Sequence, residues 1–439
     1  MKPDGQLPAY EWNFSDVNPP VQAWAAMEVY RIEKETCGLG DIIFLKRVFQ
    51  KLLINFTWWI NRKDRNGNNI FEGGFLGLDN IGVFNRSHNL SSAMQLEQAD
   101  GTSWMGMYAL NMMDMALEIA RHDIAFEDTA TKFFEHFVFI AEALNGHSLW
   151  NEEDKFYYDA LVIAGADPLP LRIQSIVGLT SLFAVSIMDK QIFDRLPDFK
   201  KRVSWFENYR ERNNLFWPNE ERGDGEEILI SLVKKDRLIH LLNRLLNEAE
   251  FLSGGGIRAL SKHHEAFPYS VMIDGNKYEI QYDPGDSTSN LFGGNSNWRG
   301  PVWMPINYLI IRSIRKYGEF YGDNLKVECP VGSGKFMNLI DVSLVLTERV
   351  VSLFAKDEKG NRKSYGKHNE FYKRPGNEDL LLFFEYFHGD TGSGLGASHQ
   401  TGWTSLVADL IGGSEVKQEE YKEGSGHEVF VEYDEEDDA

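Results

Sequence analysis

The sequence has few cysteines, a deficit of basic residues and no long apolar runs, and each shortage excludes a class of protein. Two cysteines in 439 residues, Cys37 and Cys329, are too few for a disulfide framework and lack metal-ligand spacing, so we expect two buried free thiols. The 45 basic residues against 66 acidic ones give a net charge of −21, which argues against a nucleic-acid partner because phosphate binding requires clustered Lys and Arg. No stretch reaches the ~18 uninterrupted apolar residues of a membrane span, and the N-terminus has no apolar signal core. We therefore expect no membrane partner and a cytoplasmic protein.

The common cofactor and nucleophile motifs are also missing. The sequence contains no P-loop, no dinucleotide glycine fingerprint, no Gly-x-Ser-x-Gly turn and no reactive-cysteine context. The neighbouring His263 and His264 have no third ligand at metal spacing. We expect no cofactor and no metal.

Aromatic residues are the component in excess. They make up 13% of the chain, more than a core needs, and exposed aromatic rings are one way to bind the apolar faces of sugars or bases. Part of the acidic excess is local, because residues 415–439 hold eleven acidic residues against two lysines. Such a segment buries too little apolar surface to order itself, so we expect residues 414–439 to be a disordered acidic tail.

Helical periodicity dominates residues 1–413, which we expect to form one domain. Apolar residues three and four positions apart predict about ten helices, over residues 20–35, 42–61, 102–121, 125–144, 173–188, 191–208, 226–249, 301–317, 335–355 and 401–412. Few short strands are expected, at 156–161 and 278–282. The intervening loops are long and rich in Gly and aromatic residues, which is typical of functional loops.

Such helices, joined by long loops at one rim, favour an all-α toroid in which an inner ring of helices is wrapped by an outer ring. A stacked α-solenoid is the rival, but it would show a fixed repeat of about 34–47 residues, and none is present. A complete toroid of six helix pairs needs more helices than the pattern predicts. Either the pattern misses two helices, or the toroid is incomplete at its N-terminus, which is the interpretation that we favour.

A Gly-rich segment around Asp79 is the first motif with chemical potential. Glycines at 73, 74, 77 and 82 allow close backbone approach to a ligand, and apolar neighbours such as Leu76 and Leu78 would raise the pKa of Asp79 by desolvation. A general acid needs that shift to stay protonated near neutral pH. The alternative interpretation is a Gly-rich turn in which Asp79 caps a helix.

Two further motifs lie far along the chain. Residues 292–303 contain Trp298, Arg299 and Trp303, which suit either a sugar platform or an aromatic anchor that packs a loop into the core, with Pro301 starting the next helix. Glu385 follows an apolar run and is expected at a buried rim, near His388, His399 or Tyr386. The alternative for Glu385 is a structural ion pair with Arg or His.

Taken in order, the segments 77–80, 297–303, 385–387 and 402–404 resemble glycoside hydrolase family 63. This family includes processing α-glucosidase I and mannosylglycerate hydrolases. The likeness covers almost all of residues 5–413, is strongest to the catalytic region of larger bacterial-type glucosidases, and rests mainly on the Trp-Arg-Gly-Pro stretch that starts at Trp298.

The resemblance implies an (α/α)6 catalytic domain and inverting hydrolysis of an α-glycosidic bond, in an α-glucoside or a glycosylglycerate-like carbohydrate substrate. Asp79 matches the general acid and Glu385 the general base. Substrate binding is implied for five more residues: Asn80, Trp298, Arg299, Trp303 and Trp403. The family pattern also implies an N-terminal β-rich domain upstream of this chain.

Two other classes of function remain open from the residues themselves. One is a truncated, catalytically weak toroid that binds carbohydrate. The other is a helical scaffold that binds proteins, which predicts no pair of carboxylates at a common site.

Overall fold

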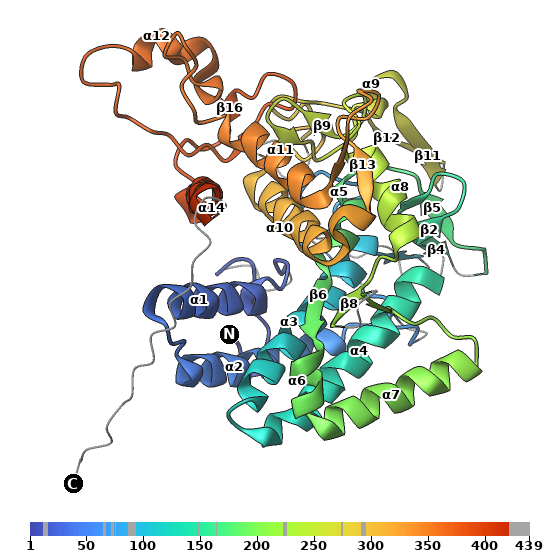
Figure 1. Cartoon of the computed structure of the whole chain (residues 1–439). Coiled ribbons are helices and arrows are strands. Elements are labelled where there is room, and N and C mark those ends of the chain that lie inside the picture. Colours follow the sequence, from blue (N-terminus) through green and yellow to red (C-terminus); the bar gives the residue numbers. More distant parts are fainter. Residues whose placement is uncertain are drawn as a thin grey trace.

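The computed structural model shows a helix-rich chain with many short strands (Figure 1). It describes residues 1–11, 16–64, 67–71, 74, 76–86, 94–146, 149–163, 165–222, 226–273, 275–290 and 296–420. The α-helices are α1 (Gln22–Cys37), α2 (Ile42–Ile60), α3 (Ala99–Ala120), α4 (Glu127–Gly146), α5 (Ile176–Leu179), α6 (Lys190–Arg195), α7 (Pro197–Arg212), α8 (Lys235–Leu245), α9 (His263–Ala266), α10 (Met304–Tyr321), α11 (Leu339–Val351), α12 (Asn369–Tyr372), α13 (Thr401–Thr404) and α14 (Val407–Glu420). The strands are β1 (Met94–Glu97), β2 (Trp150–Asn151), β3 (Phe156–Tyr157), β4 (Asp159–Ile163), β5 (Leu169–Leu171), β6 (Val185–Asp189), β7 (Asn219–Glu221), β8 (Glu227–Ser231), β9 (Leu252–Ser253), β10 (Gly256–Ile257), β11 (Tyr269–Ile273), β12 (Asn276–Ile280), β13 (Lys326–Glu328), β14 (Phe336–Asn338), β15 (Tyr386–Phe387) and β16 (Gly394–Leu395).

Helix α2 shows how the sequence specifies a long helix here. The Asp41 side chain accepts a hydrogen bond from the Phe44 amide at 2.8 Å and so caps the first turn. Leu45, Phe49 and Leu52 follow at spacings of three and four and are buried. This stripe packs α2 against α1 and α3.

Several helices pack in sequential pairs, and one of them, α3, is buried. Helix α1 contacts α2, α3 contacts α4, and α10 contacts α11, and Figure 1 shows each pair side by side. Helix α3 is buried on almost every side, so it lies inside the molecule rather than on its surface. The main apolar core extends in sequence from Val17 to Leu410.

Several sequence-based expectations need correction. Residues 173–188 form a short helix, a 3₁₀ turn and strand β6 rather than one helix, and residues 226–249 contain strand β8 before α8. Both strands are rich in β-branched residues and pair with each other, and their burial on both faces hides a period of two. Helix α11 likewise starts only after strand β14.

The start of α10 also differs from the expectation. The helix begins at Met304, with Pro305 in its first turn, so Pro301 lies before it. Val302 is excluded from the helix because it bridges Arg258 on one side and Phe387 on the other. Three chain segments that are remote in sequence therefore lie side by side, and two of them carry predicted site residues, Trp303 and Glu385.

The remaining expectations concern the cysteines, the tail and the membrane. Both cysteines are free thiols; Cys329 is buried, but Cys37, at the end of α1, is exposed. Helix α14 extends into the predicted tail as far as Glu420, and residues 421–439 lie outside the described part of the chain. In the described ranges, no helix combines the length and the apolar character that a membrane crossing requires.

Candidate active site

Asp79 lies in a run of turns and not at a helix terminus, which rules out the helix-cap interpretation. Leu76 and Leu78 on either side are buried, and the Leu76 amide donates to the Val17 carbonyl at 3.1 Å. Gly77 has a φ of 71°, a conformation that favours glycine, and this turn directs the chain toward Asp79. Glu72, Gly73 and Phe75 of the predicted motif lie outside the described residues.

The pKa of Asp79 is raised above its ordinary value, as the apolar flanks predict. Burial is the largest cause, and the charges of Glu385 and Asp16 add to it, while a hydrogen bond from Ser296 opposes the shift. The influence of Glu385 means that two carboxyl groups from distant motifs lie within electrostatic range of each other. Carboxyl groups in different environments at one site are an arrangement that acid–base chemistry can use.

Asn80 ties the first motif to the second. Its Oδ1 accepts from the Trp298 amide at 2.7 Å, and its Nδ2 donates to Asn297 Oδ1 at 3.1 Å. Asn80 is 1% exposed, so its amide is occupied by protein groups. These contacts make Asn80 a link between two loops, and its role in substrate binding stays a prediction.

Arg299 strengthens the same link. Its Nε donates to the Asn80 carbonyl at 2.7 Å and its Nη2 donates to the Gly82 carbonyl at 3.3 Å. Burial lowers the pKa of the Arg299 guanidinium, against the opposing charge of Asp283. The side chain is thus engaged with the backbone of the Asp79 loop.

The tryptophans form a stack beneath the site. Trp298 lies parallel to Trp303, with ring centroids 3.9 Å apart, and Trp303 stacks on Tyr386 at 4.7 Å. Trp403 meets Trp303 edge-on at 5.7 Å. Trp298 and Trp303 are almost fully buried, which matches the aromatic-anchor alternative, while Trp403 is half-buried. Residues 292–295, which precede this stack, lie outside the described residues.

Glu385 precedes strand β15, which pairs with β16 as a hairpin. Its carboxylate accepts a hydrogen bond from the Ala397 amide at 3.1 Å, and its carbonyl accepts one from Trp403 Nε1 at 3.2 Å. The described residues contain no ion pair between Glu385 and an Arg or His, which disfavours the structural ion-pair alternative. Glu385 is half-buried, as a carboxylate that meets both protein and solvent would be.

Sequence reasoning missed several groups around the two carboxyls. Burial and the charges of Asp79 and Asp16 raise the pKa of Tyr10, which brings the N-terminal segment to the site. Burial and the charges of Asp286, Glu385 and Asp283 raise the pKa of Tyr386. Tyr386 was noted only as a partner for Glu385, and nothing in the sequence near Tyr10 pointed to Asp79.

The Asp79 loop ends in a buried charged cluster. Arg86 Nη1 donates to Asp100 Oδ2 at 2.8 Å, and Arg86 Nη2 lies 3.7 Å from Asp159 Oδ2. Burial raises the pKa of Asp159 from 3.8 to about 7, helped by Asp100 and opposed by Arg86. The cluster joins the loop to the start of α3 and to strand β4.

We expect Asp159→Asn to stabilise the protein above neutral pH. Between pH 3.8 and about 7 the folded state holds a proton that the unfolded state has lost, so the wild-type free energy of unfolding falls as pH rises through that range. The variant lacks this fall and should be more stable at pH 8 by on the order of 1–3 kcal/mol, since one pKa unit corresponds to about 1.4 kcal/mol. Denaturant unfolding at pH 4 and pH 8 measures the difference.

Asp154→Asn is the matched control. Arg172 donates two hydrogen bonds to Asp154, at 2.7 and 2.6 Å, and these lower the pKa of this carboxyl despite its partial burial. Its stabilising effect is present above its unfolded pKa and is lost on acidification, so the control should be less stable than wild type at pH 8. Equal losses of unfolding free energy in both variants at pH 8 would contradict the raised pKa of Asp159.

Of the two adjacent histidines, His264 makes side-chain contacts with backbone groups, and the ring of His263 stacks on Phe267. His264 Nε2 accepts from the Gln174 amide at 2.9 Å, and its Nδ1 lies 3.0 Å from the Phe267 carbonyl. Across the part of the chain that the structure describes, no group of three or more His, Cys, Asp or Glu side chains is arranged to hold a metal ion.

Comparison with known proteins gives the relationships of the chain. Residues 199–404 match the model of the mannosylglycerate hydrolase MGH1-like glycoside hydrolase domain. The uncharacterized protein YMR196W of Saccharomyces cerevisiae is 50% identical over 433 residues, covering 94% of this chain and 40% of its own length. The yeast mannosyl-oligosaccharide glucosidase is 26% identical over 124 residues, covering 28% of this chain and 12% of its own length. The chain thus spans about two-fifths of the length of its 50% identical relative.

Solved structures share the fold at low sequence identity. An uncharacterized conserved protein from Thermus thermophilus superposes with a TM-score of 0.54 at 15% identity, covering 94% of this chain and 84% of that one. The family 63 mannosylglycerate hydrolase of the same organism, in complex with glucose, gives a TM-score of 0.51 at 12% identity and covers 94% and 85% of the two chains. Residues 199–404 are thus similar to an MGH1-like glycoside hydrolase domain, a shorter segment is weakly similar to the yeast glucosidase, and the fold is similar to that of the family 63 mannosylglycerate hydrolase.

Proposed function

We propose that this chain is the catalytic part of an inverting glycoside hydrolase that cleaves an α-glycosidic bond in an α-glucoside or a glycosylglycerate-like substrate. The observation that carries the proposal is the raised pKa of Asp79, caused first by burial and then by the charge of Glu385. It supports a protonated acid and an ionised base at one site. It also counts against a protein-binding scaffold, which would need no such pair.

In the proposed reaction, Asp79 donates its proton to the glycosidic oxygen as the bond from that oxygen to the anomeric carbon breaks. Glu385 accepts a proton from a water molecule, and the oxygen of that water bonds to the anomeric carbon from the opposite face. The products are an alcohol and a sugar with inverted configuration. Proton exchange with solvent then restores Asp79 to its acid form and Glu385 to its carboxylate.

The architecture that we propose with this function is an (α/α)6 toroid formed by residues 1–413 as one catalytic domain. The sequential helix pairs and the apolar core that extends from Val17 to Leu410 support it. Asn80, Trp298 and Trp303 are buried and then support the sugar site through their packing, whereas Arg299 and Trp403 are half-buried and are the more accessible of the five predicted substrate-binding residues. An upstream domain and a cytoplasmic location stay predictions from the sequence.

Glu385→Gln tests the base. The variant keeps an oxygen that can accept from the Ala397 amide but cannot take a proton from water, so kcat should fall by about 10²–10⁴-fold while substrate still binds. Hydrolysis of a panel of α-glucosides and mannosylglycerate measures the loss, and NMR of the first wild-type product identifies its anomeric configuration. Undiminished activity in the variant, or a product with retained configuration, would be incompatible with the proposed mechanism. Sugar binding in calorimetry with no turnover by the wild type would favour a non-catalytic carbohydrate-binding toroid.

A further inference from the structure

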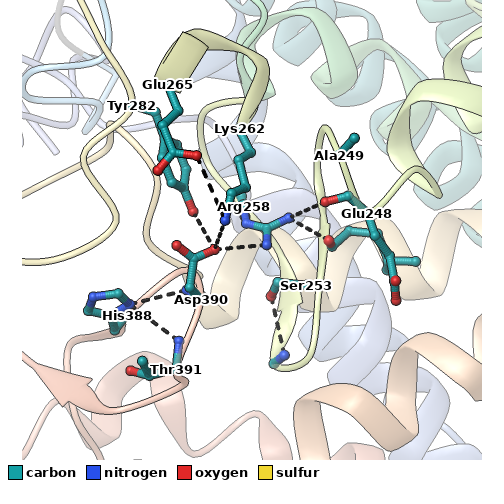
Figure 2. Close-up of polar contacts among 12 residues, drawn as sticks. Glu248, Ala249, Ser253, Arg258, Lys262, Glu265, Tyr282, His388, Asp390 and Thr391 are labelled. Carbon is teal, nitrogen blue, oxygen red and sulfur yellow. Dashed lines mark hydrogen bonds and ion pairs between the residues drawn. The ribbon is translucent and has the colours of Figure 1, made fainter.

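One carboxylate outside the proposed acid–base pair, that of Asp390, accepts hydrogen bonds from three side chains. Asp390 Oδ1 accepts from Arg258 Nη2 at 3.0 Å, from Lys262 Nζ at 3.2 Å and from Tyr282 OH at 3.1 Å. Figure 2 shows these three side chains converging on Asp390 from two separate chain segments. Neither the sequence motifs nor the proposed reaction accounts for this convergence.

Asp390 is at the tip of the hairpin whose base carries Glu385. Strand β15 follows Glu385 directly, and the turn 388–393 leads into β16. His388 Nδ1 accepts from the Asp390 and Thr391 amides at 3.1 and 3.3 Å, which fixes the shape of this turn (Figure 2). At the base, the Glu385 amide donates to the Ala397 carbonyl at 2.8 Å. Hydrogen bonds therefore hold both ends of the hairpin, with Asp390 at its tip and Glu385 at its base.

The donors to Asp390 belong to segments that also hold the Trp298–Arg299 loop. Arg258 bridges Val302, and Val302 bridges Phe387 of β15, so the three segments lie side by side. The Asp283 amide, next to Tyr282, donates to the Arg299 carbonyl at 2.6 Å. Asp390 thus closes a ring of contacts that includes the hairpin and the Trp298–Arg299 loop.

Tight packing makes this ring sensitive to small displacements. A Cβ added at Gly389 would lie 2.5 Å from the Gly300 carbonyl oxygen and 2.8 Å from Tyr282 OH. A Cβ at Gly300 would lie 2.8 Å from the Tyr282 ring. The backbone of the hairpin tip, the Tyr282 ring and the Trp298–Arg299 loop therefore touch with no spare space.

We propose that Asp390 is a positioning residue that anchors the hairpin tip to Arg258, Lys262 and Tyr282 and thereby sets the place of the Glu385 carboxylate relative to Asp79. The inference rests on the proposed function, because it assigns Glu385 the role of base. Asp390 itself touches neither Glu385 nor Asp79 in the described contacts, so it acts through the hairpin. Its partners keep it ionised: burial raises the pKa of Asp390, but hydrogen bonds from Lys262 and Arg258 bring it below its ordinary value.

The test is a graded series at position 390, assayed with the full chain. Asp390→Ala removes the acceptor, and kcat should fall by about 10–100-fold with KM within about threefold, because a displacement of about 1 Å at a reacting group costs up to about 10²-fold. Asp390→Asn keeps an acceptor without the charge and should recover part of the loss. Tyr282→Phe removes one of the three donors and should give a smaller fall in kcat.

A second measurement separates this inference from the proposed function. Hydrogen exchange of the amides in residues 385–397 should accelerate about tenfold or more in Asp390→Ala and remain unchanged in helices α3 and α4. Asp357→Asn, in an exposed loop whose carboxylate bonds to its own loop, is the matched control and should change neither exchange nor kcat. If the wild type hydrolyses no substrate, the proposed function fails while the exchange result still tests the anchor.

Three results would overturn the anchor. One is a folded Asp390→Ala with wild-type kcat and exchange. Another is a loss confined to KM, which would make Asp390 a sugar-binding group. If Asp390→Ala does not fold, the third result comes from Tyr282→Phe. A wild-type kcat together with wild-type hydrogen exchange in residues 385–397 of that variant would contradict the proposal.

Discussion

Asp79→Asn is expected to lower kcat on substrates with poor leaving groups by about 10²–10⁴-fold, the range that general acid–base catalysis supplies. The amide has nearly the shape of the carboxyl and can accept the hydrogen bond from Ser296, but it has no proton to give to the glycosidic oxygen. Burial and the nearby Glu385 charge raise the pKa of Asp79, so the wild-type profile of kcat/KM should have an alkaline limb that the variant lacks. Initial rates between pH 4 and pH 9 measure both effects.

The leaving group supplies an internal control for Asp79→Asn. Aryl glycosides with strongly acidic phenols depart without protonation, so the variant should retain far more activity on them than on methyl or sugar glycosides. Equal losses on both substrate classes would mean that Asp79 does not act as the acid. Circular dichroism and thermal unfolding check that the variant is folded.

Trp303→Ala is expected to destabilise the protein by about 3–5 kcal/mol, the usual cost of removing a buried Trp or Phe ring from a core. Trp303 is 2% exposed, stacks between Trp298 and Tyr386, and donates from Nε1 to the Asn297 carbonyl at 2.9 Å. Truncation leaves a cavity and an unpaired carbonyl under the site. Denaturant unfolding of the variant at neutral pH measures the loss.

Two variants define what Trp303 does. Trp303→Phe keeps an aromatic ring in the stack but loses the indole donor, so it should lower the free energy of unfolding by less than the alanine variant does. Trp205→Ala removes a ring that is 60% exposed on α7 and should change stability by less than about 1 kcal/mol. A stable Trp303→Ala with weakened sugar binding would instead support the prediction that this ring faces the substrate.

Amphipathic helices were the part of the fold that the sequence specified well. The stripe of Leu45, Phe49 and Leu52 with the Asp41 cap determined α2 closely, because one face is buried and the other meets solvent. Strands β6 and β8 were misassigned as helix, because strands buried on both faces carry no visible alternation. The bridges that join Arg258, Val302 and Phe387 depend on tertiary structure, so no local sequence pattern predicts them.

The direction of the Asp79 pKa shift was predictable from the sequence, whereas the contacts of the candidate site were less so. Apolar neighbours of Asp79 correctly indicated a raised pKa, since desolvation is a local effect. The sequence could not distinguish an aromatic ring that faces a sugar from one that anchors a loop, because both need Trp in a Gly-rich segment. Asn80 illustrates the limit, as its partners Asn297 and Trp298 come from a different third of the chain.

That separation has a consequence for how the protein acquires activity. The hydrogen bond between Asn80 and Asn297 spans 217 positions of sequence, a contact of very high order. Helix pairs such as α3 and α4 form from local contacts and need none of the later sequence. Contacts between distant segments, in contrast, form only after the entropic cost of closing a long loop has been overcome. During synthesis, the Asp79 loop must remain without its partners until residues 297–299 have left the ribosome. We therefore expect helical structure to form before the proposed site, and the proposed activity to return late in refolding.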